Sequence, residues 1–387
     1  MANTVTLTGL TEILYRARDI VARELVGIIP SVTINGGSEG VSLGGTVSSV
    51  VTAQPTLNTD HTPAMTVPAG DDTTITTETM TIGQKSRTNI PIKGEIAKQL
   101  ANTADYGLVL EQLFAQHIRT HVNAIESHCG SVIKDGASRA YGTAGTAPFG
   151  SDFNATAQIR KILVDNGCPM DGQVSLVIDT NAGVNLRSLA QLQKANEAGS
   201  AAMLRNGELL NLNGLSIKES AGIAAHTKGA GASGLINGAE AIGQTTLTYD
   251  TLTVNTTGYK AGDVITFAAD TSNKYVIKTG STATGGDIVI ANPGLKTAIP
   301  DNNAITIGNS YTGNVAFHRA AVELAMRPPA MPEGGDLARE RMTVYDPVSG
   351  LVFEVALYPG YGMNLIEIVC YYQAKVWKSE FVATLLG

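Results

Sequence analysis

The sequence predicts an α+β protein built from one long central helix, a compact α/β unit and several groups of short strands. Residues 104–135 carry the strongest helical pattern, with apolar side chains recurring every three to four positions. Segments rich in threonine and valine, separated by glycine, proline and asparagine, predict strands on both sides of that helix. A length of 387 residues allows two or three domains with their own cores.

Charge and composition narrow the class of protein. A net charge of −7 excludes tight DNA binding through counterion release, and 5% aromatic residues are too few for base-stacking surfaces. Cys129, Cys168 and Cys370 lack metal-ligand spacing, which predicts buried, reduced thiols. With no secretory signal and no run of 18 apolar residues, we expect synthesis in the cytosol and no membrane partner.

In the first quarter of the chain, the predicted secondary structure changes from helix to strand at Pro30. Residues 8–29 predict an amphipathic helix that ends at this proline. Residues 31–93 are poor in large apolar side chains, and they alternate in polarity at 46–51, 73–81 and 89–92, which predicts strands. Because such a stretch can bury little core of its own, we expect an extended arm and hairpin that lie on a neighbouring subunit.

The central helix has one broad apolar face. A helix over 104–135 would be roughly 45–50 Å long at 1.5 Å per residue. The side chains expected on its buried face are Leu110, Phe114, Ile118, Val122, Ile125, Cys129 and Val132.

After the central helix, the sequence predicts an α/β segment, then a β-rich segment, and then a helical segment again. Residues 152–225 predict a compact α/β unit, with helices at 155–165 and 181–196 and strands at 174–178 and 215–218. Residues 226–312 contain 16 threonines and 12 glycines, and they predict a small antiparallel barrel or sandwich. A helical pattern returns at 315–326, so the β-rich block is an inserted domain. The predicted strands of this part are 247–255, 264–268, 275–278, 287–290, 304–307, 351–358 and 364–372.

Two glycine motifs match enzyme signatures in their residues but lack the surrounding secondary structure that those signatures require. Residues 36–40 (GGSEG) fit the nucleophile elbow G-x-S-x-G, but the β-branched sequence that follows is not the helix this elbow requires. Residues 229–234 (GAGASG) fit the dinucleotide pattern, but they stand at the entry to the β-rich block and predict a linker. The pair Asp71-Asp72 predicts a solvated turn.

Three histidines follow one stripe of the central helix. His117 and His121 are one turn apart, but Ile118 replaces the glutamate of the metalloprotease motif. His128 is about 10 Å further along, beyond the reach of the same ion. We interpret all three as histidines packed at an interface, with a metal site and a pH-sensitive contact as alternatives. The sequence therefore predicts no catalytic, cofactor-binding or metal-binding residues and no cofactor.

Two segments resemble a known family. Residues 257–268 (TGYKAGDVITFA) are similar to a T-G-x-K-x-G-D-x-I-x-F-A segment in the inserted β-domain of certain short-tailed-phage coat proteins. Residues 370–381 (CYYQAKVWKSEF) resemble the closing strand of that family, with Gln373, Lys378 and Ser379 in place of its glycine and arginine-proline. The order of the predicted elements also resembles the Hong Kong 97 phage capsid fold.

This resemblance implies an α+β, Hong Kong 97-like capsid fold with an inserted antiparallel β-barrel domain (I-domain). The implied divisions are an N-terminal arm (1–50), an E-loop β-hairpin (51–95), the spine helix and P-domain (96–150), the first part of the A-domain (151–225), the inserted β-barrel (226–312), the A-domain return (313–341) and the closing P-domain and A-domain strands (342–387). Some relatives cross-link through an E-loop lysine, and Lys85 and Lys93 are the lysines present here.

The implied function is that of a major capsid protein, not an enzyme, which self-assembles in pentamers and hexamers into an icosahedral shell around double-stranded DNA. The implied partners are identical subunits, a scaffolding protein, a portal protein, DNA bound without sequence-specific contacts, and decoration proteins as a further candidate. The protein would be part of the virion and would assemble in the host cytoplasm. The alternatives are another phage structural protein, such as a tail-tube or decoration protein, and a cytosolic enzyme with an appended β-domain.

Overall fold

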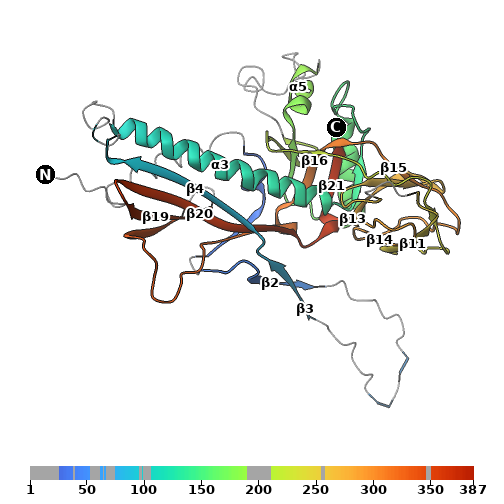
Figure 1. Cartoon of the computed structure of the whole chain (residues 1–387). Helices are drawn as coiled ribbons and strands as arrows, with labels where there is room; N and C mark the ends of the chain where they lie inside the picture. Colours follow the sequence, from blue (N-terminus) through green and yellow to red (C-terminus); the bar gives the residue numbers. More distant parts are fainter. Residues whose placement is uncertain are drawn as a thin grey trace.

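A computed structural model describes residues 26–37, 40–52, 62–63, 65–66, 75–95, 98, 106–189, 211–253, 258–345 and 350–387. These residues form two adjoining lobes and a two-stranded ribbon that projects from them (Figure 1). Up to residue 25, the helix predicted for 8–29 lies outside the described residues. At its described end the prediction is wrong, because Val26–Ile28 are not helical and Pro30 lies inside the short 3-10 helix η1 (Ile29–Ser31).

The first lobe contains a sheet of six described strands in the order β1-β17-β20-β19-β18, with β4 paired to β20. One edge of β20 pairs with β4 over ten residues, and the other edge is divided between β19 and β17. The six strands are β1 (Thr33–Gly36), β4 (Gln84–Lys93), β17 (Val322–Arg327), β18 (Glu340–Tyr345), β19 (Val352–Gly360) and β20 (Met363–Val376).

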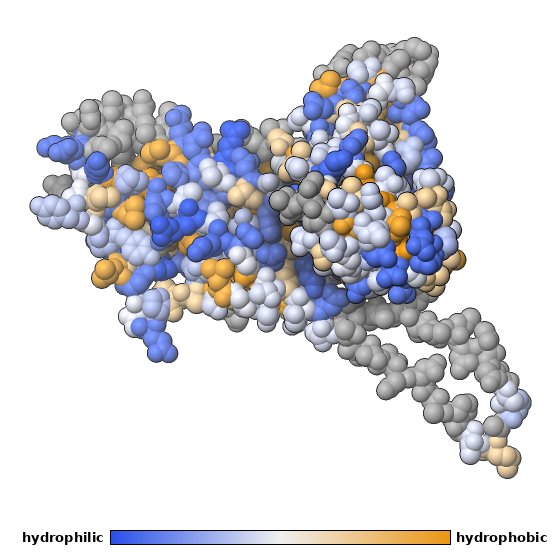
Figure 2. Space-filling view, turned by 45° about the vertical axis from the view of Figure 1, so that its right-hand side comes forward, coloured by the Kyte–Doolittle hydropathy of each residue, from blue (hydrophilic) through white to orange (hydrophobic). Residues whose placement is uncertain are grey.

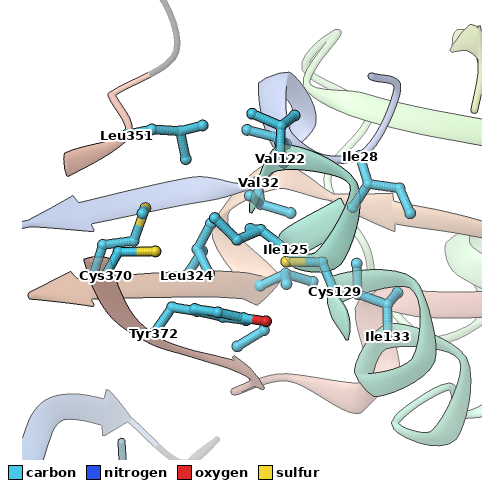
Figure 3. Packing of buried hydrophobic residues seen from close by; sticks show 14 of the residues in the cluster. Ile28, Val32, Val122, Ile125, Cys129, Ile133, Leu324, Leu351, Cys370 and Tyr372 are labelled. Atoms are coloured by element: carbon cyan, nitrogen blue, oxygen red, sulfur yellow. The ribbon is translucent and has the colours of Figure 1, made fainter. Parts of the chain in front are cut away.

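Helix α3 (Tyr106–Asp135) lies along this sheet (Figure 1). Its 30 residues give a length of about 45 Å at 1.5 Å per residue. The predicted apolar face is confirmed: Leu110, Phe114, Ile118, Val122, Ile125 and Cys129 are buried, and Val132 is partly buried against the same core. Figure 3 shows Ile125 and Cys129 directed toward Leu324 of β17 and Tyr372 of β20. Helix and sheet therefore share one core.

The second lobe is organised around a branched sheet of 13 described strands. Its strands are β5 (Arg139–Tyr141), β6 (Val174–Ile178), β7 (Asn211–Leu212), β8 (Leu215–Glu219), β9 (Ala225–His226), β10 (Leu235–Ile236), β11 (Thr246–Asp250), β12 (Val264–Phe267), β13 (Asp270–Thr279), β14 (Gly286–Ile290), β15 (Ile305–Ile307), β16 (Tyr311–His318) and β21 (Val382–Leu386). The remaining 3-10 helices are η2 (Arg319–Ala321) and η3 (Ser379–Phe381).

Helices α4 (Asn154–Asp165) and α5 (Thr180–Ser188) confirm the predicted α/β unit around the fully buried strand β6. The Asp179 side chain caps α5 by accepting hydrogen bonds from the N–H groups of Asn181 and Ala182. Leu189 is extended, so α5 ends before the predicted limit, and residues 190–196 lie outside the described residues.

Strands β10 to β15 bury a core of their own, which includes Tyr249, Phe267 and Tyr275. The strands predicted in this part are present with shifted ends; β11, for example, ends at Asp250. The sheet nevertheless continues into the rest of the lobe, because β13 pairs with β5 as well as with β12 and β14.

The helix predicted over 315–326 is wrong. These residues form the end of β16, the turn η2 and most of β17. Continuous apolar runs fit a buried helix or a buried strand equally well, and the environment decides between them. Here β16 lies between β6 and β21, and β17 lies between β1 and β20. Both are buried central strands.

Candidate functional site

A ribbon of two strands, β2 (Thr46–Thr52) and β3 (Ile75–Thr81), projects from the body of the protein (Figure 1). The two strands pair from Thr46↔Thr81 to Thr52↔Ile75, and among the described residues neither pairs with a third strand. Val50 is 63% exposed, and only Met80, close to the body, is fully buried among the described side chains of the ribbon. A free two-stranded ribbon is marginally stable and leaves strand edges open for pairing.

The root of the ribbon is fixed to the body. The Lys375 ammonium on β20 lies 2.9 Å from a Glu78 carboxylate oxygen and donates a hydrogen bond of 2.9 Å to the Thr79 carbonyl. Ile82 is buried, its N–H donates to the Gly45 carbonyl at 2.9 Å, and its carbonyl accepts from the Gly44 N–H. The ribbon therefore leaves the body at a defined point.

The expectation that all of residues 31–93 rest on a neighbouring subunit is wrong for both ends of that stretch. Strand β1 pairs in parallel with β17, and β4 pairs with β20. Ile90 and Ile92 on β4 are buried in the core beneath α3. Among the described residues of this stretch, the part that protrudes is the ribbon of β2 and β3.

The three histidines of α3 do not converge. His121 is buried between α3 and β4, where it contacts Ser86 and Thr88. His128 packs edge-on against Tyr372, with ring centroids 5.5 Å apart. Burial lowers the pKa of His117, His121 and His128. Within the described part of the chain, no group of three or more His, Cys, Asp or Glu side chains could hold a metal ion.

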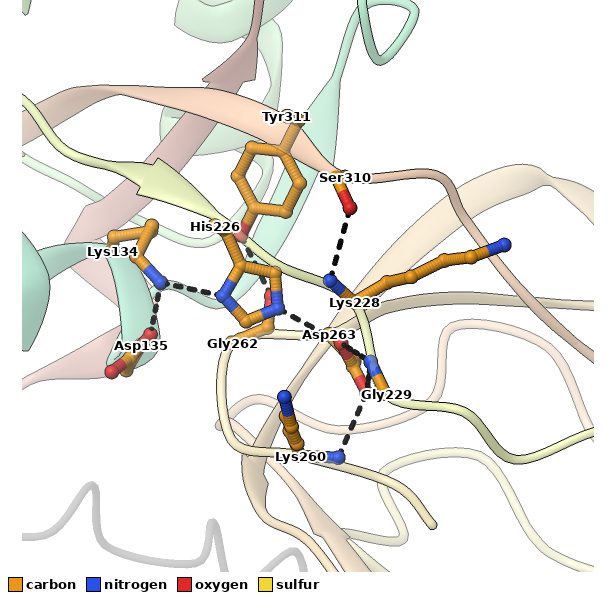
Figure 4. Close-up of polar contacts among 10 residues, drawn as sticks. All are labelled: Lys134, Asp135, His226, Lys228, Gly229, Lys260, Gly262, Asp263, Ser310 and Tyr311. Carbon is orange, nitrogen blue, oxygen red and sulfur yellow. Dashed lines mark hydrogen bonds and ion pairs between the residues drawn. The ribbon is translucent and has the colours of Figure 1, made fainter. Parts of the chain in front are cut away.

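A cluster of buried polar side chains lies where the end of α3 meets the second lobe (Figure 4). The Lys134 ammonium lies 2.6 Å from Asp135 and 2.9 Å from His226 Nδ1. Because an ammonium group only donates, Nδ1 accepts, and His226 Nε2–H donates to the buried Asp263 carboxylate at 2.8 Å. This relay joins the end of α3 to strand β9 and to the turn before β12.

The same turn explains part of the TGYKAGDVITFA segment. Asp263 accepts hydrogen bonds from the N–H groups of Lys260 and Gly229, which fixes the tight turn. Gly262 has φ +85°, and a Cβ there would come within 2.3 Å of an Asp135 carboxylate oxygen. A glycine is therefore required both by the backbone and by the close approach to α3. Sequence reasoning found the segment but not its partners on the helix.

The glycine motifs form no catalytic arrangement among the described residues. In the 36–40 motif, Ser38 and Glu39 lie outside the described residues, as do Asp71 and Asp72. Gly229 donates its N–H to Asp263, and residues 229–234 form the irregular connection into the β-rich block, as predicted. Lys85 and Lys93 both lie on β4.

A groove of about 500 Å³ crosses the face of the first sheet opposite α3. Among the charged side chains that line it, Arg341 pairs with Asp336, and Arg87 pairs with Glu367. Arg341 also pairs with Glu354 of β19. Elsewhere, Figure 2 shows hydrophobic residues interspersed with polar ones on the visible surface. The ion pairs of Arg341 and Arg87 in the groove indicate that this face of the sheet has a structural role.

No protein-family model and no curated protein matches the chain. Solved phage structures do resemble it in fold. A structure of Mycobacterium phage Che8 is 15% identical, covers 88% of this chain and 84% of that chain, and has a TM-score of 0.47. The capsid structure of cyanophage P-SCSP1u is 11% identical, covers 92% and 86%, and has a TM-score of 0.49. The mature capsid of bacteriophage PhiM1 is 11% identical, covers 92% and 85%, and has a TM-score of 0.44. No described helix is long and apolar enough to cross a membrane.

Proposed function

We propose that this chain is the major capsid protein of a tailed bacteriophage, which self-assembles into an icosahedral shell around double-stranded DNA. The observation that carries the proposal is the ribbon of β2 and β3, which is anchored to the body at its root and pairs with no third described strand. A second copy of the chain would supply the strand edges and apolar surface that the ribbon lacks. The phage capsids to which the chain is similar support the same function.

The contact we propose is modest but repeated. Val50 is exposed on the ribbon, opposite Thr77 of β3, and this mixture of apolar and polar side chains suits an interface that forms after folding. Interfaces of about 800 Å² per partner, repeated around each subunit, would hold a shell without any single strong contact. Pentamers and hexamers would both be built from this contact.

The finer assignments follow the Hong Kong 97 arrangement. Helix α3 and the first sheet would be the spine helix and P-domain, the ribbon the E-loop, and the sheet around β6 and β16 the A-domain. The separate core of β10 to β15 supports the proposal of an inserted β-domain over residues 226–312. We propose that this block braces the A-domain, which the hydrogen bond from the Lys296 ammonium to the Asp165 carbonyl supports. The Lys134–His226–Asp263 relay would tie the same block to the spine helix.

The remaining partners are proposed from the assembly itself. A shell needs a scaffolding protein during assembly and a portal for its genome, and it can carry decoration proteins. The net charge of −7 suits a wall that encloses DNA without adsorbing it. The proposed location is the virion, after assembly in the host cytoplasm.

Electron microscopy of the purified full-length protein tests the function. We expect closed shells or open sheets of pentamers and hexamers, formed alone or with a scaffolding protein. Regular tubes would instead favour a tail-tube protein. Discrete small oligomers under every assembly condition, with or without scaffold, would contradict the proposal and favour the enzyme alternative.

A further inference from the structure

His121, near the middle of α3, is fully buried against the strand that leads to the ribbon. The Ser86 hydroxyl lies 2.5 Å from its Nδ1 and the Thr88 hydroxyl 2.8 Å from its Nε2. The ring also tilts against Phe353 of β19, at 5.9 Å between centroids. Both ring nitrogens are therefore bound by hydroxyl groups of β4.

The neutral imidazole suits this position. A hydroxyl can either donate or accept, so one nitrogen donates and the other accepts without any charge. An imidazolium could still donate to both hydroxyls, but its charge would lie in an apolar core between Ile118 and Val122. Burial of an uncompensated charge is costly.

Among the described residues packed around the ring, no carboxylate is positioned to offset that charge. Successive residues of a strand point to opposite faces, so Ser86 and Thr88 face α3 while Lys85 and Arg87 face the groove. The carboxylates of the packed elements have other partners: Glu126 of α3 binds backbone N–H groups, Glu354 of β19 binds Arg341, and Glu367 of β20 binds Arg87. The other titratable groups toward this side are His117 of α3 and Cys370 of β20, which is opposite Ser86.

We propose that His121 is an acid-sensitive latch that holds β4, and with it the root of the ribbon, against helix α3. Protonation would favour separation of β4 from the helix, because the ring then regains water. Since only Ile82 and Gly83 separate β4 from β3, release of β4 would change how the ribbon is held. The latch acts within one chain, so it does not depend on the proposed capsid function.

The direction of the pH effect follows from the burial of the ring. Desolvation, with a smaller repulsion from His117, outweighs a backbone hydrogen bond at Ile368 and lowers the pKa of His121 to about 4. The separated state would have the ordinary value of about 6.5. The latched state therefore keeps its full stability above pH 6.5 and loses it as the pH falls from 6.5 toward 4. Between pH 7.5 and pH 5 the open population should rise roughly 30-fold.

Hydrogen–deuterium exchange of the full-length protein tests the latch. Protection factors of residues 84–93 and 110–125, corrected for intrinsic exchange at each pH, should fall roughly 30-fold from pH 7.5 to pH 5. His121→Gln should keep its protection at pH 5 within about 3-fold of that at pH 7.5. The matched control His117→Gln, one turn away on α3, should retain the loss. Unchanged wild-type protection at pH 5, or an undiminished loss in His121→Gln, would refute the proposal.

Ser86→Asp gives an independent test if His121→Gln does not fold. A carboxylate beside Nδ1 would pair with the imidazolium, so the protection of 84–93 should persist at pH 5. If Ser86→Asp loses as much protection at pH 5 as the unsubstituted protein does, the proposed latch is refuted. Both readouts measure a single chain, so their failure is distinct from failure to form shells.

Discussion

The Glu126 carboxylate accepts a hydrogen bond of 2.7 Å from the backbone N–H of Ile28, a residue 98 positions earlier in the chain. The same carboxylate accepts from the N–H groups of Gly27 and Ile29 and from the Ser220 hydroxyl, at 2.7–2.9 Å. One buried side chain of α3 thus joins residues 27–29 to the loop after β8. These hydrogen bonds stabilise the irregular segment that leads into strand β1 of the first lobe.

Removal of this carboxylate should strongly destabilise the protein. Glu126→Ala leaves three buried N–H groups and a hydroxyl without their acceptor, which should cost about 3–5 kcal/mol. Glu126→Gln keeps one acceptor oxygen and should cost less, about 1–3 kcal/mol. Urea unfolding measures both, with the exposed Glu333→Gln as a control within ~0.5 kcal/mol. An Ala variant as stable as this control would contradict the role of Glu126.

The contact between the KAGD turn and α3 is tested by a pair of glycine substitutions. Gly262 and Gly238 both have positive φ, +85° and +93°, but only at Gly262 would a Cβ meet Asp135 and Lys134. Gly238→Ala should therefore cost only backbone strain, about 1–2 kcal/mol. Gly262→Ala should cost roughly 2 kcal/mol more and should increase amide exchange around His226 and Asp263. Equal effects of the two substitutions would show that the close approach is unimportant.

The buried face of α3 is tested by two adjacent residues. Phe114 is 1% exposed in the core, whereas Leu113 is 39% exposed. Phe114→Ala should lower the free energy of unfolding by about 3–5 kcal/mol. Leu113→Ala should lower it by less than about 1 kcal/mol, because little apolar area is lost. Urea titration measures the free energy of unfolding of both variants. Similar losses in the two variants would contradict the observed rotation of α3, which buries Phe114 and exposes Leu113.

The cysteines should be unreactive in the folded protein. Burial raises the pKa of Cys168 to about 11 and that of Cys370 to about 12, and it also raises the pKa of Cys129. Because the thiolate is the reactive form, all three should react slowly with a thiol reagent at pH 8 and rapidly after denaturation. Fast stoichiometric labelling of the native chain would be inconsistent with this packing.

The elements that depend on local pattern were predicted well. The buried face of α3 follows from the spacing of residues such as Leu110 and Phe114, and spacing is visible in the sequence. Strands β16 and β17 were missed because their apolar runs carry no distinctive period. Only the neighbouring strands, which come from distant parts of the chain, determine that Val315 and Leu324 lie in sheets.

The polar centres could not be predicted because their partners are far apart in sequence. Lys134 and His226 are 92 positions apart, and Glu126 and Gly27 are 99 positions apart. Neither pair forms a recognisable motif. The arm was predicted from its few large apolar residues, yet Ile90 and Ile92 were enough to seat β4 beneath α3. A few well-placed side chains outweighed the average composition.

The most direct test of the central claim is excision of the ribbon. Because Gly44 and Gly45 are hydrogen-bonded to Ile82, residues 46–81 can be replaced by an Asn-Gly turn without stretching the chain. We expect a folded protein with unchanged Glu126 and His226 contacts by amide exchange, but no shells in sedimentation and electron microscopy under conditions where the intact chain assembles. Shells of normal yield and stability from the excised chain would contradict the account.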